Sequence, residues 1–151
     1  MARAERRADV VWEGNLVHGY GKIVNVGSGA LGELPITWAS RTERSDGKTS
    51  PEELLAAAHA ACYAMAFSHT LAQAGTPSER LTVSATCAFE QVGEGFKATT
   101  MDLDVRGKVP GLDQAGFEKV AQQAEQGCPV SNASVNAFAH CAPFRVLVGP
   151  N

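Results

Sequence analysis

The alternation of apolar and polar residues in the first third of the chain predicts short antiparallel strands. Residues Asp9–Val17 alternate loosely, and a second strand, Lys22–Val26, follows a turn at Gly19–Gly21. A third strand is expected over Leu34–Ala39. The next segment, Ser40–Thr49, is polar and contains an Asp-Gly pair, which is typical of a loop.

A long apolar helix is the clearest element that the pattern predicts. Ser50 is expected at the N-cap, Pro51 at the first helical position, and Glu53 completes a capping box. The helical pattern continues to about Ala74, before Gly75 stops it. Its middle is apolar on nearly every face, and nine of its residues are alanine. Because a helix that is apolar all round is normally buried all round, we expect it to be the central helix.

The second half of the chain alternates again. Residues Leu81–Val92 and Phe96–Val109 predict a long antiparallel hairpin around a glycine-containing turn. A second helix is expected from an N-cap at Asp113 to Gly127, a glycine suited to the position after the last helical residue. A final strand is expected over about Ala139–Val148. This order predicts an α+β fold in a single domain, residues 1–151.

Composition and charge exclude several classes of protein. With 44% hydrophobic residues, the chain can build one core, which excludes disordered, collagen-like and coiled-coil proteins. The 13 basic and 16 acidic residues give a net charge of -3, so no nucleic-acid partner is indicated. The N-terminus lacks the apolar core of a signal peptide, and the apolar run Leu54–Phe67 is too short to span a bilayer. We therefore expect a cytoplasmic protein with no membrane partner.

The cysteine spacing does not indicate a disulfide framework or a zinc site. No pair among Cys62, Cys87, Cys128 and Cys141 has C-x-x-C spacing, and cytosolic thiols are normally reduced. Cys62 lies among alanines, where a buried packing residue is the more common case. Cys128, between a helix-ending glycine and a proline, is as compatible with a functional thiol as with a buried turn residue. Cys87 and Cys141 fall within predicted strands and are interpreted as packing residues.

Charged and imidazole side chains near Cys62 leave further alternatives open. His59 and His69 lie broadly on the same helix face as Cys62, so a Cys–His pair is conceivable, although a hydrogen-bonded structural histidine is more common. Arg41 and Arg44 are either solvated or aimed at a thiolate. No cofactor and no metal site are expected.

Four motifs give the chain a specific resemblance. Thr49–Ala66 (TSPEELLAAAHAACYAMA) and Gly127–Ser131 (GCPVS) resemble the two cysteine motifs of the OsmC/Ohr family of thiol peroxidases. Val11–Asn15 and Val109–Asp113 resemble the OsmC branch. The resemblance covers nearly the whole chain, apart from the segment past Asn136, and the spacing of about 65 residues between the two cysteine motifs makes it specific.

The resemblance implies a fold, a subunit arrangement and a set of site residues. It implies antiparallel sheets around a long central helix, in an intertwined homodimer with active sites at the subunit interface. Cys62 matches the peroxidatic cysteine, Cys128 the resolving cysteine, and Glu52 the glutamate that holds the catalytic arginine. That arginine is expected to be Arg41, with Arg44 as the second choice.

The implied reaction reduces organic hydroperoxides through a Cys62 sulfenic acid and a Cys62–Cys128 disulfide. Only about a tenth of a free thiol is thiolate at pH 7.5, and burial lowers that fraction, so a cation such as Arg41 is needed. An apolar pocket is expected from residues such as Leu54, Leu55, Tyr63 and Met65. A dithiol, such as a lipoyl-bearing protein, would reduce the disulfide. The residues also leave open a Cys–His hydrolase that uses Cys62 with His59, and a non-catalytic binding protein.

Overall fold

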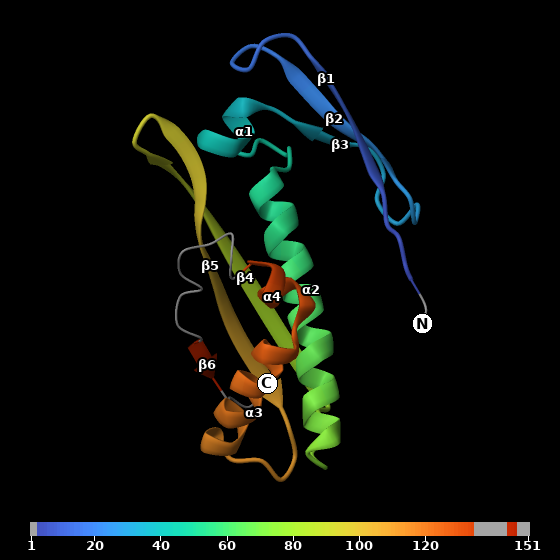
Figure 1. The fold of residues 1–151 in the computed structure, drawn as a ribbon, viewed down its shortest axis with the longest axis vertical. Helices are drawn as coiled ribbons and strands as arrows, with labels where there is room; N and C mark the ends of the chain where they lie inside the picture. The colour runs from blue at the N-terminus through green and yellow to red at the C-terminus, as the bar shows by residue number, and fades with distance from the viewer. Residues whose placement is uncertain (1–2, 135–144, 148–151) are drawn as a thin grey trace. The chain divides into compact units, whose positions relative to one another are not determined.

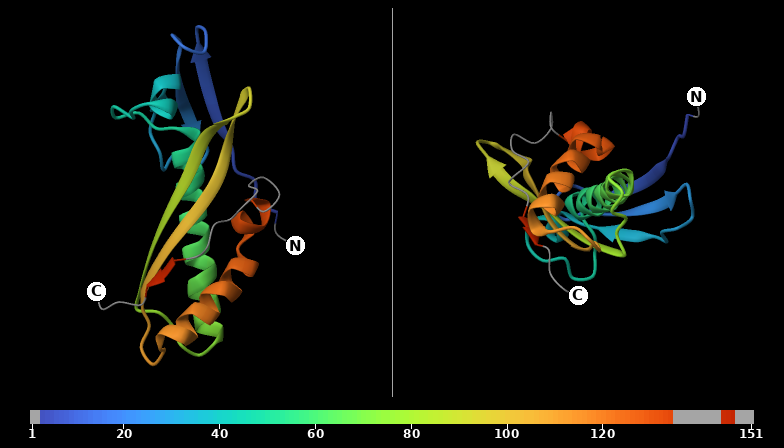
Figure 2. Two further views of the ribbon diagram at one scale, coloured as in Figure 1. Left: turned by 90° about the vertical axis from the view of Figure 1, so that its left-hand side faces the viewer. Right: turned by 90° about the horizontal axis from the view of Figure 1, so that it is seen from below.

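The computed structural model describes residues 3–134 and 145–147, and the chain divides into two compact units, residues 1–51 and 52–151. Each unit contains a three-stranded sheet and helical segments, so the α+β class predicted from the sequence is confirmed. Figure 1 labels the elements, and Figure 2 gives two further views.

The first unit is an antiparallel sheet of β1 (Ala8–Glu13), β2 (Tyr20–Val26) and β3 (Leu34–Ile36) in that order. The turn predicted at Gly19–Gly21 is wrong, because β2 begins at Tyr20. The chain instead turns between Gly14, whose φ is 87°, and Gly19. Gly21 pairs with Trp12 across the strands, and a Cβ there would lie 2.6 Å from the Trp12 ring. This glycine makes room for an aromatic ring instead of making a turn.

A short helix replaces the end of the third predicted strand and the start of the predicted loop. Helix α1 covers Trp38–Thr42, and Thr37 caps it by accepting a hydrogen bond of 3.0 Å from the Ser40 backbone N–H. The Ser40 hydroxyl also donates to the carbonyl of Thr49, which fixes the other end of the loop. The prediction was wrong here because the cap uses Ser40 where the expected pattern has Glu or Gln.

The second unit contains the long hairpin, and this prediction is confirmed. Strands β4 (Arg80–Val92) and β5 (Gly95–Lys108) pair antiparallel, and the two-residue turn between them starts at Gly93, whose φ is 64°. Strand β6 (Arg145–Leu147) pairs parallel to β5. The rest of the strand predicted over Ala139–Val148 lies outside the described residues.

The central helix and the second helix lie where the sequence predicts them. Helix α2 covers Pro51–Gln73. Gly75, whose φ is 79°, follows the last turn, and the backbone N–H of Thr76 donates to the carbonyl of Leu71. Helix α3 covers Gln114–Gly127, and the Asp113 side chain accepts from the Gly116 N–H at 2.8 Å.

The end of α3 differs from the prediction. Gly127 is the last helical residue, not the glycine after it, and Cys128 is the C-cap with extended backbone angles. The chain then enters the short helix α4 (Pro129–Ser134) directly. No left-handed residue is needed because α4 continues the helical path after a single extended residue.

The core of the second unit lies between one face of the hairpin and helices α2 and α3. The inward side chains of β5 include Leu103 and Val105, and Phe67 of α2 meets Phe117 of α3 edge to face, with 4.9 Å between ring centroids. Phe117 also packs on Gly107, where a Cβ would lie 2.6 Å from its ring. Figure 1 and Figure 2 show α2 running along the hairpin.

Within this chain α2 is buried on one face and exposed on the other, so the expectation of burial all round is not met. The buried stripe consists of Glu52, His59, Tyr63, Phe67 and Leu71. Apolar side chains of α2 are also exposed, among them Met65 at 69% on the opposite side and Leu55 at 43% near the start of the helix. Helix α2 is also long enough and apolar enough to cross a membrane. The core helix of a soluble protein meets the same two criteria.

Candidate active site

The fold brings Cys62 and Cys128 into direct contact. Cys62 lies in the middle of α2, half-buried against the core, and Cys128 lies between α3 and α4 with no exposed surface. Cys62 packs against the buried cluster that contains Cys128, and both the Cys128 side chain and the backbone of Val130 act on the pKa of the Cys62 thiol. One thiol is therefore accessible from solvent, while the second lies behind it in the core.

This environment by itself disfavours the Cys62 thiolate. Burial raises the pKa of the Cys62 thiol above its ordinary value, and the Cys128 side chain adds to the increase. The backbone of Val130 acts in the opposite direction, since it stabilises the charged form. Activation of this thiol therefore requires a positive charge beyond these groups.

His59 and Ser131 form a buried polar pair beside the two thiols. His59 precedes Cys62 by one helical turn, and its Nε2 lies 2.8 Å from the Ser131 hydroxyl oxygen. The backbone N–H of Ser131 donates to the Cys128 sulfur at 3.5 Å. Burial lowers the pKa of His59, so the imidazole is neutral. Its described hydrogen bond leads to Ser131, whereas a Cys–His nucleophile would require it to engage Cys62.

The predicted apolar lining residues are arranged differently from the expectation. Tyr63 has no exposed surface, and its hydroxyl donates to the carbonyl of Ala121 at 2.9 Å, so it is a core residue. Burial raises the pKa of this phenol far above its ordinary value, which keeps it protonated. Leu55 and Met65 are exposed, and Met65 lies on the far side of α2 from the buried stripe.

The carboxylate of Glu52 acts on the Cys87 thiol in the second unit. Glu52 lies in the first turn of α2 and is 6% exposed, a position where the helix dipole favours a carboxylate. Cys87 lies on β4, paired with Met101 of β5. Burial raises the pKa of the Cys87 thiol, and the negative charge of Glu52 raises it further. Cys87 is therefore protonated at neutral pH, in agreement with its interpretation as a packing residue.

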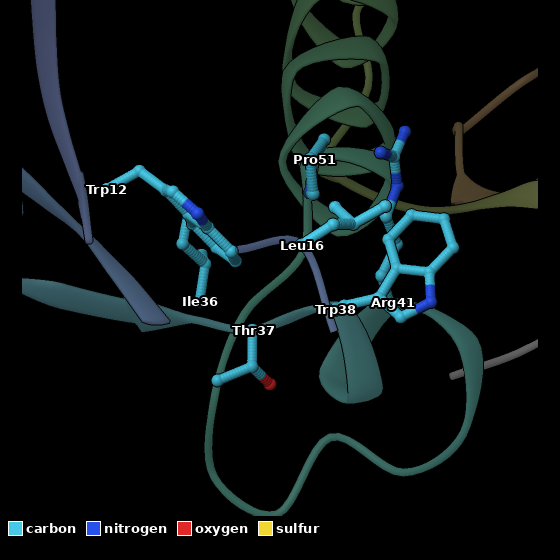
Figure 3. A pocket seen from close by; sticks show the side chains of 7 residues that line it. All are labelled: Trp12, Leu16, Ile36, Thr37, Trp38, Arg41 and Pro51. Carbon is cyan, nitrogen blue, oxygen red and sulfur yellow. The ribbon is translucent and has the colours of Figure 1, made fainter. Parts of the chain in front are cut away.

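The first unit contains Arg41 in an apolar pocket. Seven residues line this open pocket of about 350 Å³: Trp12, Leu16, Ile36, Thr37, Trp38, Arg41 and Pro51. The Arg41 guanidinium carbon lies 5.9 Å from the centre of the Trp38 ring, and Figure 3 shows the two side chains next to each other. A guanidinium over an aromatic face is held by a cation–π contact.

The two candidate arginines have different surroundings. Arg41 is half-buried on α1, whereas the Arg44 side chain is 83% exposed and reaches Asp46 at 3.5 Å. An exposed pair of this kind is weak and screened by salt. Of the two, Arg41 is the cation that an apolar ligand would meet.

Sequence reasoning missed several residues of these sites. Trp12 and Trp38 line the pocket, and the apolar N-terminal pattern indicated only strands. Ser131 was quoted only as part of the second cysteine motif. Ser131 lies three residues after Cys128, and His59 lies three residues before Cys62. This equal spacing is the signal that could have paired His59 with Ser131. Among residues 3–134 and 145–147, no group of three His, Cys, Asp or Glu side chains is placed to hold a metal ion.

Comparison with known proteins places this arrangement in a family. A family model described as OsmC-like protein matches residues 44–139. The chain is 38% identical over 126 residues to Peroxiredoxin OsmC of Escherichia coli (strain K12), covering 83% of this chain and 87% of the relative. It is 34% identical over 88 residues to an Organic hydroperoxide resistance protein of Xanthomonas axonopodis pv. citri, covering 57% of this chain and 59% of the relative.

Solved structures show the same fold. An organic hydroperoxide resistance protein OsmC from Legionella pneumophila superposes with a TM-score of 0.67 at 22% identity, covering 98% of this chain and all of that one. The two cysteine motifs, the long helix, the hairpin and these similarities together lead to one assignment: the chain belongs to the OsmC-like protein family.

Proposed function

We propose that this protein is a thiol-dependent peroxidase that reduces organic hydroperoxides to alcohols. The observation that carries the proposal is the contact between a half-buried Cys62 and a fully buried Cys128. The names of its relatives, a peroxiredoxin and an organic hydroperoxide resistance protein, support the same reaction.

Cys62 is the peroxidatic residue in this proposal because it is the more accessible of the two thiols. Its thiolate attacks one oxygen of the hydroperoxide, an S–O bond forms, and the O–O bond breaks. The alkoxide that leaves takes up a proton to become the alcohol, and Cys62 becomes a sulfenic acid.

Cys128 then resolves the sulfenic acid. Its thiol loses a proton, the sulfur attacks the Cys62 sulfur, and the S–O bond breaks as hydroxide leaves and is protonated to water. A dithiol reductant, such as a lipoyl-bearing protein, restores both thiols by disulfide exchange. Burial of Cys128 protects this thiol from direct oxidation and reserves it for Cys62.

Arg41 supplies the positive charge in this proposal, and Glu52 restrains its guanidinium. Burial raises the pKa of the Cys62 thiol, so the thiolate needs a permanent cation, and arginine remains charged in such surroundings. The same cation stabilises the departing alkoxide. Arg41 comes either from the same subunit as Cys62 or from its partner.

The pocket around Arg41 gives the proposed substrate its class. Its walls are largely aromatic and aliphatic side chains, with the guanidinium as its one charged group. Such a pocket favours an alkyl or lipid hydroperoxide over hydrogen peroxide, because apolar burial contributes about 0.8 kcal/mol per methylene group.

We also propose that both units form one OsmC-like domain and that this domain works as an intertwined homodimer in the cytoplasm. The exposed apolar residues Leu55 and Met65 of α2 and Val10 and Val11 of β1 support a partner chain. Obligate interfaces typically exceed about 2,000 Å². A stable monomer in sedimentation at micromolar concentration would refute the dimer.

The test is peroxide consumption followed by mass spectrometry. The reduced protein is mixed with one equivalent of cumene hydroperoxide, and then with dihydrolipoamide for turnover. The expected result is one equivalent consumed, one Cys62–Cys128 disulfide formed, and continued turnover with the dithiol. Cumene hydroperoxide should be consumed faster than hydrogen peroxide.

Two outcomes would replace the proposal. A Cys–His hydrolase would give an acyl-enzyme on Cys62 with an ester substrate and would not depend on Cys128. A binding protein would consume no peroxide, and its thiols would react slowly with iodoacetamide.

A further inference from the structure

A buried side-chain hydrogen bond connects the two segments that carry the thiols. His59 lies three residues before Cys62 on α2, and Ser131 lies three residues after Cys128. The two side chains are 72 residues apart in the sequence and 2.8 Å apart in space. Both are almost fully buried, at 1% and 2% exposure.

The polar character of this pair calls for a role beyond filling space. The Nδ1 atom of His59 is buried and has no hydrogen-bond partner among the described residues, so the bond to Ser131 is the polar contact that the structure gives this ring. Burying a polar group costs free energy that an aliphatic side chain at the same place would avoid. A neutral imidazole has one N–H, which we assign to Nε2, because a bare ring nitrogen at Nδ1 is tolerated better than an unpaired N–H.

The same segment contacts both sulfurs through its backbone. The backbone of Val130 lowers the pKa of the Cys62 thiol, and the N–H of the next residue, Ser131, donates to the Cys128 sulfur at 3.5 Å. The position of residues 128–131 against α2 therefore sets how the two sulfurs face each other. The His59–Ser131 bond is the side-chain contact that fixes this position.

We propose that His59 and Ser131 are positioning residues for the resolving step: their hydrogen bond holds Cys128 where it attacks the Cys62 sulfenic acid. This inference rests on the proposed peroxidase function. In that step the Cys128 thiol gives its proton to solvent, the S–S bond forms, and the oxygen of the sulfenic acid leaves as water. The oxidant is the hydroperoxide already consumed by Cys62. Loosening the pair prolongs the life of the sulfenic acid, which a second peroxide then converts to sulfinic acid.

The experiment separates the two chemical steps in a single turnover. Wild type, Ser131→Ala and His59→Leu are each mixed with one equivalent of cumene hydroperoxide without reductant. Peroxide loss reports the first step. The Cys62–Cys128 disulfide, read by mass spectrometry after rapid quenching, reports the second, and dimedone traps any sulfenic acid that persists.

We expect the first step to stay within about twofold of wild type in both variants and disulfide formation to slow by about tenfold, the upper end for one neutral hydrogen bond. Dimedone labelling of Cys62 should rise in parallel, and in samples without dimedone a second equivalent of peroxide should give more sulfinic acid at Cys62 than in wild type. His59→Gln, whose amide can still donate to Ser131, and Ser131→Thr, which keeps the hydroxyl, should recover much of the second step.

Matched controls come from the same elements. Ser134→Ala removes another buried hydroxyl of α4, and His69→Leu removes an exposed histidine of α2; both should form the disulfide at the wild-type rate. Thermal unfolding of each variant measures general loss of stability.

Disulfide formation at the wild-type rate in both Ser131→Ala and His59→Leu would overturn the inference. So would equal slowing of both steps, because that indicates general destabilisation and not positioning. If wild type itself consumes no peroxide or forms no Cys62–Cys128 disulfide, the proposed function has failed and the inference falls with it. That failure is visible in wild type alone.

Discussion

Cys62 and Cys87 are both half-buried thiols whose pKa burial raises, yet their neighbours differ in kind. Around Cys62 lie a second thiol, which raises the pKa further, and the Val130 N–H, which lowers it. Around Cys87 lies the carboxylate of Glu52, which raises the pKa further. Burial alone therefore does not distinguish a reactive cysteine from a packing cysteine, whereas the groups that face the sulfur do.

Removing each thiol in turn gives the largest expected difference. Cys62→Ser should reduce cumene hydroperoxide turnover at least about 10³-fold, because the activated nucleophile is lost and serine does not replace it. Cys87→Ser should stay within about twofold of wild type, since its protonated thiol has no part in the reaction. The measurement is kcat/KM with dihydrolipoamide in excess. Equal loss in both variants would contradict the distinction between the two sites.

The proposed cation gives the next largest effect. Arg41→Ala should lower kcat/KM by about 10²–10³, the usual loss for one charge-stabilising group in a water-poor site. Without the cation, the pKa of Cys62 should lie above its ordinary value, as that of Cys87 does. The pH at which iodoacetamide labels Cys62 should therefore move upward.

Arg44→Ala is the control for Arg41→Ala, because it removes the same charge from the exposed end of the loop. It should retain near-wild-type turnover. If Arg44→Ala loses activity and Arg41→Ala does not, the arginine has been assigned wrongly.

Removal of the resolving thiol tests whether Cys87 can replace Cys128. Cys128→Ser should consume the first equivalent of peroxide within about twofold of the wild-type rate and form no intramolecular disulfide, after which excess peroxide converts Cys62 to sulfinic acid. Mass spectrometry of the quenched protein measures both. A Cys62–Cys87 disulfide would show that the two sites communicate.

Glu52→Gln should give the smallest effect. It should make the Cys87 thiol more reactive and lower the peroxide turnover at Cys62. Removing the negative charge lowers the pKa of Cys87, so iodoacetamide labelling of Cys87 at pH 8 should become faster. Peroxide turnover should fall, because the arginine loses its proposed restraint. Unchanged labelling of Cys87 would show that the Glu52 charge does not reach this thiol.

Local signals in the sequence were sufficient for the regular elements. The proline and acidic residues at the start of α2 and the glycine after its end are read within a few positions, and the observed helix, Pro51–Gln73, agrees with the prediction to about one residue. The alternation in the hairpin is equally local. The errors had separate causes. Gly21 makes room for the Trp12 ring, Ser40 takes the place in the α1 cap where Glu or Gln is expected, and Gly127 stays helical because α4 follows α3 after one extended residue.

By itself the sequence determined which residue types are available for chemistry, namely two cysteines in two specific motifs, two arginines in the segment before the central helix and a glutamate at the start of that helix. Only the tertiary structure decided which of them meet. The contacts between Cys62 and Cys128 and between His59 and Ser131 depend on how α3 and α4 pack on α2. Such packing follows from burial of a shared core and not from any local periodicity. The residue pattern alone therefore did not pair these residues: the family resemblance implied the Cys62–Cys128 disulfide, and the His59–Ser131 bond was not predicted.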